Sequence, residues 1–80
     1  MPTLLYAEGF RFFFYSREGV PLERPHVHVR QGNQEVKLWL TPIVRVAWNK
    51  RVDPRTLKQL VAITEQHRAS FEEQWNVFFA

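Results

Sequence analysis

Residues 25–40 read PHVHVRQGNQEVKLWL, and their alternation of apolar and polar side chains predicts a β-hairpin. Gly32 and Asn33 suit a two-residue turn of type II′ between the two strands. A turn at these two positions places every apolar pair on one face of the hairpin, whereas a slip of one residue would mix the faces. The predicted pairs are Gln31–Gln34, Arg30–Glu35, Val29–Val36, His28–Lys37, Val27–Leu38 and His26–Trp39.

The remaining sequence extends this hairpin into an α+β fold: an antiparallel sheet of about four strands with one long C-terminal helix packed on one face. An exposed loop is expected at 16–24, and Asp53 followed by Pro54 is typical of a helix start. No Pro or Gly interrupts residues 55–80. We expect strands at roughly 3–7, 10–15, 25–30 and 35–40, a further candidate strand at 43–47, and a helix at roughly 54–79.

Length and composition favour a single domain over residues 1–80. Aromatic residues make up 15% of the chain, which helps a small core to bury enough apolar surface. There is no cysteine, so disulfides and thiolate chemistry are excluded. The chain shows neither a signal peptide nor an apolar run long enough for a membrane span, and we therefore expect a cytoplasmic protein. The net charge of +3 favours an acidic partner.

The end of the predicted helix suggests an interface. A helix over 54–79 would span ~39 Å, whereas strands of six residues span ~20 Å. The helix should therefore overhang its sheet, and its apolar end would be covered by a second copy or a small partner protein, or else by the first strand or an edge loop of this chain. The residues of this candidate interface are Phe71, Trp75, Phe78 and Phe79.

The second face of the sheet carries the candidate functional residues. By strand alternation it combines cations, flat aromatic rings and the two histidines His26 and His28. With a single helix, nothing else in the chain covers this face, so it is a candidate contact surface. The candidate binding residues on it are Arg11, Phe13, Tyr15, Arg30 and Trp39.

Four activities fit this mixture of side chains. It could dock a protein, with aromatic and arginine side chains as anchors, or bind single-stranded RNA by stacking bases and pairing phosphates. It could also cleave RNA, with His26 and His28 as base and acid and Lys37 as the cation that stabilises the phosphorane. A metal site is the fourth reading, but the pair has only His67 as a further histidine and no acidic residue at an obvious ligand spacing. We therefore predict neither a metal nor another cofactor.

Several of these motifs resemble the bacterial domain-of-unknown-function family 4160. They are GFRFFFYS at 9–16, PHVHV at 25–29, KLWL at 37–40 and a helix ending near Trp75 and Asn76. Members are often encoded beside another small protein, of domain-of-unknown-function family 2442. The resemblance therefore implies a two-component system of the toxin–antitoxin kind, and it supplies no catalytic residues.

Residues and resemblance together favour an interaction module that acts through the basic aromatic sheet face, with a small protein or a second copy as partner. The alternative is an RNA-binding protein or a small metal-independent ribonuclease that uses His26 and His28.

Overall fold

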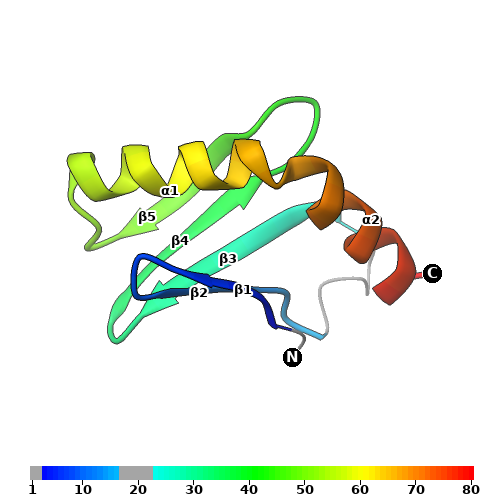
Figure 1. The fold of residues 1–80 in the computed structure, drawn as a ribbon, viewed down its shortest axis with the longest axis horizontal. Helices are drawn as coiled ribbons and strands as arrows, with labels where there is room; N and C mark the ends of the chain where they lie inside the picture. Colours follow the sequence, from blue (N-terminus) through cyan, green and yellow to red (C-terminus); the bar gives the residue numbers. More distant parts are fainter. Residues whose placement is uncertain (1–2, 17–22) are drawn as a thin grey trace.

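The computed structural model describes residues 3–16 and 23–80 and shows an antiparallel sheet with helices on one face (Figure 1). The five strands follow chain order as a meander, β1-β2-β3-β4-β5. The α+β class is confirmed, with five strands rather than about four and two helices rather than one. Most of the loop expected at 16–24 lies outside the described residues. The elements are β1 (Thr3–Ala7), β2 (Phe10–Phe13), β3 (His26–Gln31), β4 (Gln34–Trp39), β5 (Arg45–Lys50), α1 (Pro54–Gln66) and α2 (Arg68–Phe78).

Two tight turns set the strand registers. The β3–β4 hairpin has all six predicted pairs, and Gly32 adopts a φ of 58°, as the first position of a type II′ turn requires. Between β1 and β2, Glu8 and Gly9 have φ values of 54° and 76°, the two positive values of a type I′ turn. This second turn places Ala7 opposite Phe10. Local turn chemistry therefore determines which side chains of these strands share a face.

The core lies between the sheet and the helices. The apolar face that we expected the helix to cover is buried there, with Val27, Val29 and Leu38 fully excluded from solvent. The helices add Leu60, Phe71 and Trp75 to it. The buried apolar residues of this core are Phe10, Phe12, Phe14, Val27, Val29, Val36, Leu38, Leu40, Val52, Leu60, Phe71 and Trp75.

The prediction of one long helix over 54–79 is wrong in detail, because two helices, α1 and α2, meet at a bend at His67 (Figure 1). The Thr64 hydroxyl donates to the carbonyl of Leu60 at 2.8 Å, a contact that often bends helices. Just after the bend, Arg68 Nη2 donates to the carbonyl of Pro42 at 2.8 Å and ties the start of α2 to the β4–β5 connection. The bend turns α2 toward the sheet.

The expectation that the end of this helix lacks a cover from its own chain is therefore wrong as well. Phe71 packs against Phe12 with ring centroids 6.0 Å apart, and Trp75 packs edge-on against Phe14 at 5.1 Å. Both side chains are buried within this chain, at 1% and 3% exposure. Of the candidate interface residues, Phe79 is partly buried against the core and Phe78 is 43% exposed. The surface that the helix end offers is thus smaller than expected.

We expect Phe71→Ala to destabilise the fold by about 3–5 kcal/mol, because it removes a buried ring that joins α2 to the sheet. Chemical denaturation measures the change in the free energy of unfolding. The control is Val77→Ala on the same helix, whose side chain is 75% exposed and which should change stability by less than ~0.5 kcal/mol. If both variants changed the free energy of unfolding by the same small amount, α2 would not pack on the sheet.

We also expect Asp53→Ala to lower the melting temperature at neutral pH. Asp53 is the N-cap of α1, and its carboxylate accepts from the Thr56 N–H at 2.9 Å and from the Thr56 hydroxyl at 3.0 Å. These hydrogen bonds lower the pKa of Asp53. The stabilisation is therefore present at neutral pH and is lost as the pH falls through the lowered pKa. Melting curves across this range should show Asp53→Ala and the wild type converging at acidic pH. Asp53→Asn keeps a capping oxygen that does not titrate, so it should match wild type at neutral pH and melt above it at acidic pH.

Candidate functional site

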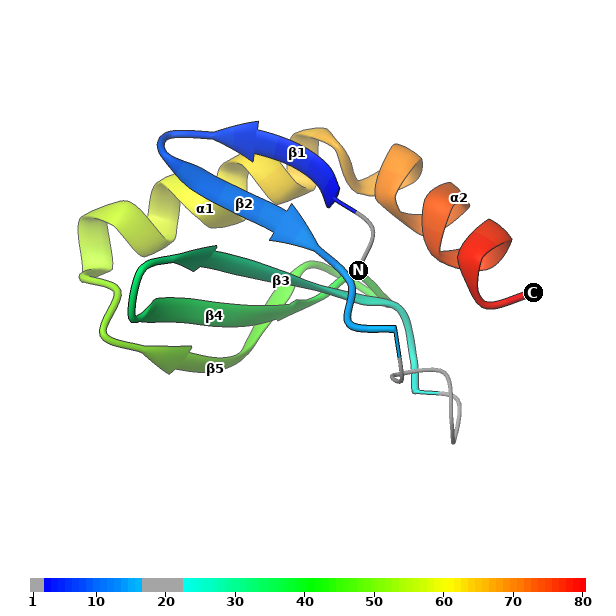
Figure 2. The same ribbon diagram turned by 90° about the horizontal axis from the view of Figure 1, so that it is seen from below.

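The sheet face opposite the helices, seen in Figure 2, brings the two histidines of β3 together. The rings of His26 and His28 lie edge to face with centroids 5.2 Å apart. Their exposures are 0% and 3%, so aromatic side chains cover this part of the face although no described helix lies across it. The expectation that the face leaves both histidines open to solvent is therefore wrong.

Aromatic rings from β2 and its extension and from β5 surround His28. Tyr15, which follows β2, approaches it edge-on at 4.4 Å, and Phe13 stacks on it at 5.7 Å. Trp48 on β5 lies 5.8 Å away. His28 Nδ1 lies 3.2 Å from Glu35 Oε2. Since a carboxylate only accepts hydrogen bonds, Nδ1 is the donor, and this contact fixes a proton on that nitrogen.

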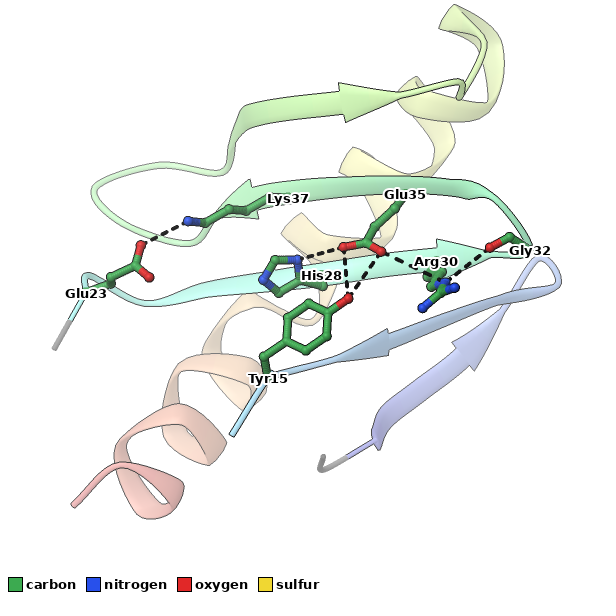
Figure 3. A network of polar contacts seen from close by, with 7 residues as sticks. All are labelled: Tyr15, Glu23, His28, Arg30, Gly32, Glu35 and Lys37. Carbon is green, nitrogen blue, oxygen red and sulfur yellow. Dashed lines mark hydrogen bonds and ion pairs between the residues drawn. The ribbon is translucent and has the colours of Figure 1, made fainter. Parts of the chain in front are cut away.

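Glu35 is the centre of a polar network on this face (Figure 3). Besides the contact with His28, the Glu35 carboxylate accepts a hydrogen bond from the Tyr15 hydroxyl, which lies 3.2 Å from Oε2 and 3.3 Å from Oε1. Arg30 Nε lies 4.0 Å from Glu35 Oε1. Burial raises the pKa of Tyr15, and the negative charge and hydrogen bond of Glu35 raise it further, while Arg30 opposes the shift. The network locks the orientation of the imidazole.

Our sequence interpretation left Glu35 out of the predicted binding and catalytic residues. The signal was nevertheless present, because the hairpin register already places Glu35 opposite Arg30 and therefore on the same face as His28.

His26 connects the sheet to α2. Its Nδ1 donates to the carbonyl of Arg24 at 3.0 Å, since a carbonyl oxygen only accepts. Its ring packs against Trp39 at 5.5 Å and against Trp75 of α2 at 4.8 Å. At 0% exposure, this ring meets neighbouring side chains rather than solvent.

Lys37 does not turn toward the histidines, although it pairs with His28 in the sheet. Its Nζ lies 2.9 Å from Glu23 Oε1 and 4.5 Å from the centroid of the Trp39 ring. Figure 3 shows Lys37 and His28 directed to different carboxylates. Arg24 Cζ also lies over the Trp39 ring, at 4.1 Å. The structure thus brings His26 and His28 together but separates the Lys37 ammonium from them.

The other predicted binding residues lie on this face too. Arg11 pairs with Arg30 across β2 and β3, and its guanidinium lies 4.6 Å from the centroid of the buried Phe13 ring. Three residues of β5 were missed because the boundaries of this strand were uncertain from sequence. They are Arg45, Trp48 and Lys50, which pair with Trp39, Lys37 and Glu35 and are all exposed.

A groove of about 470 Å³ lies elsewhere, between β1 and α2. Leu4, Phe14 and Phe78 form much of its apolar lining, and Glu73 contributes a carboxylate. The histidines do not line it, so the groove and the polar network are separate features.

Within residues 3–16 and 23–80, no group of three or more His, Cys, Asp or Glu side chains is arranged to hold a metal ion. The third histidine, His67, stacks on Phe71 at 5.7 Å, within the helical layer. None of the helices described is long and apolar enough to cross a membrane.

We expect Glu35→Gln to lower the pKa of Tyr15, because it removes the negative charge beside the phenol. Ultraviolet titration of tyrosinate in a Tyr6→Phe background isolates Tyr15 from the other tyrosine. Glu65→Gln on α1 makes the same charge change away from the network and should leave the titration unchanged. An unshifted pKa in Glu35→Gln would contradict the contact between the two side chains.

Comparison with known proteins identifies the family of this chain. No similar protein was found among curated proteins, and no similar fold among solved structures. The family described as Domain of unknown function (DUF4160) matches residues 9–76, which include the aromatic β2 strand, both histidines, Glu35 and most of α2. The chain therefore belongs to the DUF4160 family.

Proposed function

We propose that the chain is a non-catalytic interaction module that binds a small acidic protein through the helix-free face of its sheet, as one half of a two-component system of the toxin–antitoxin kind. The observation that carries this proposal is the segregation of charge between the two sides of the fold. Complementary charge across an interface speeds association and selects the partner.

The excess of positive charge lies on the helix-free face. Its carboxylates are Glu23 and Glu35, and both already pair with cations or with His28. Its cations are Arg11, Arg24, Arg30, Lys37, Arg45 and Lys50. On the helices, by contrast, Arg55, Lys58 and Arg68 are balanced by Glu65, Glu72 and Glu73. Among the described residues, the helix-free face thus has six cations against two carboxylates, whereas the two helices have three of each.

Aromatic side chains on the same face supply apolar contact. Trp48 is 42% exposed in the midst of these cations, and tryptophan and arginine are the residues most often found at energetic centres of protein interfaces. The buried layer of Phe13, His26 and His28 lies on the same face and gives these side chains a rigid support. A rigid surface loses little conformational entropy when a partner binds.

The geometry gives less support to RNA cleavage. A general base and a general acid must reach the substrate, whereas His26 and His28 are buried and hold a proton on Nδ1 toward Arg24 and Glu35. Lys37, the expected cation for the phosphorane, is directed to Glu23. RNA binding without cleavage is the alternative that a binding assay must separate from protein binding.

Association between copies of this chain through the helix-free face is disfavoured by repulsion between its cations. A homo-oligomer would instead use the apolar end of α2, where Val77 and Phe78 are exposed beside the groove.

The test is complex formation with the partner that the family resemblance implies, a small protein of domain-of-unknown-function family 2442, measured by size-exclusion chromatography with light scattering. The double charge reversal Arg45→Glu/Lys50→Glu should abolish or strongly weaken the complex, because both exposed cations flank Trp48 on β5.

The matched control is Arg55→Glu/Lys58→Glu, which changes the net charge by the same amount on exposed positions of α1. It should leave the complex intact. No complex for the wild type, or equal loss in both double variants, would overturn the proposal. Binding of wild type to single-stranded RNA in preference to the protein would favour the alternative.

A further inference from the structure

Lys37 occupies an unusual position for a cation on a binding face. It lies in the middle of β4, and its side chain is only 13% exposed. Its ammonium lies 4.5 Å from the centroid of the Trp39 ring, so the indole covers part of its surface. An ammonium that is shielded in this way needs a hydrogen-bond acceptor, and it is held in place by the strand and the ring.

Glu23 supplies that acceptor in the free chain. Its Oε1 lies 2.9 Å from Lys37 Nζ, while its own side chain is 40% exposed. The pair is therefore asymmetric: the cation is shielded and fixed in the sheet, and the carboxylate reaches it from the solvent side. Because the Glu23 side chain is 40% exposed, it can turn into solvent, and a carboxylate of a partner can then accept from Lys37 in its place.

Arg24 extends the same cationic site. Its guanidinium lies 4.1 Å from the centroid of the Trp39 ring, so this one indole carries both Arg24 and Lys37. A ring that is engaged with two cations is a poor platform for a nucleic-acid base, which needs the ring face for stacking. The acceptor that the site already holds is a carboxylate. Both observations favour an acidic side chain of a protein over RNA.

We propose that Lys37, beside Arg24 on the Trp39 ring, is the anchor for a glutamate or aspartate of the partner, and that Glu23 occupies this position in the free chain and competes for it. This inference rests on the proposed function, because it names the contact through which the helix-free face holds an acidic partner. By this competition, Glu23 sets the affinity of the Lys37 site for the partner's carboxylate and disfavours weakly acidic partners.

The test uses the purified chain and a fluorescein-labelled, glutamate-rich peptide, with binding measured by fluorescence anisotropy at low salt. Glu23→Gln should bind the peptide about fivefold more tightly than wild type, the ratio expected for loss of one competing surface ion pair. Lys37→Gln should weaken binding, and adding Glu23→Gln to it should then bring no gain.

Glu65→Gln is the matched control, since it makes the same charge change on α1, outside this face. If it tightens binding as much as Glu23→Gln does, competition by Glu23 is overturned while the proposed function stands. If wild type binds neither the peptide nor the proposed partner protein, both proposals fail. A single-stranded RNA of matched charge that binds more tightly than the peptide, and responds to the same substitutions, would overturn the acidic anchor in favour of a phosphodiester.

Discussion

The register of the β3–β4 hairpin is the constraint on which the rest of this molecule depends. Gly32 accepts a φ of 58° without the clash that a Cβ would bring, and the two-residue turn then leaves one pairing of the strands. Because side chains alternate strictly along a strand, that pairing sends Val27, Val29 and their partners to the core and the histidines to the other face. A shift by one residue would exchange the two faces.

The second face shows how a five-stranded sheet buries polar aromatic groups without a helix above them. The imidazole of His28 is enclosed by rings and hydrogen-bonded through Nδ1 to Glu35, so its polar nitrogen meets a charged acceptor rather than an apolar wall. His26 is held in the same way by the carbonyl of Arg24, and it contacts α2 through Trp75. The histidine pair thus gives the face rigidity and orientation.

Segregation of charge gives this rigid face its chemical character. Cations surround Trp39 and Trp48, whereas the helices carry balanced charge. In the function that we propose, this rigid, basic surface with its exposed tryptophan contacts an acidic protein, and the buried histidines support the surface rather than exchange protons with a substrate. The Lys37–Glu23 pair belongs to this surface, since it holds one cation next to the indole with its own carboxylate.

Interactions between residues near one another in the chain were sufficient to predict the hairpin, its register and the shared face of His26, His28, Trp39 and Lys37. Strand period and turn chemistry encode these features locally, and the register also contained the position of Glu35. The tie between Arg68 and Pro42 that holds α2 after the bend, the burial of Phe71 and Trp75, and the choice of Glu23 by Lys37 depend on residues that are distant in sequence. Periodicity cannot reveal them, because a straight helix and a bent helix present the same apolar spacing. Only packing of the whole chain selects between these alternatives, since it decides which apolar surface is covered and which charges meet.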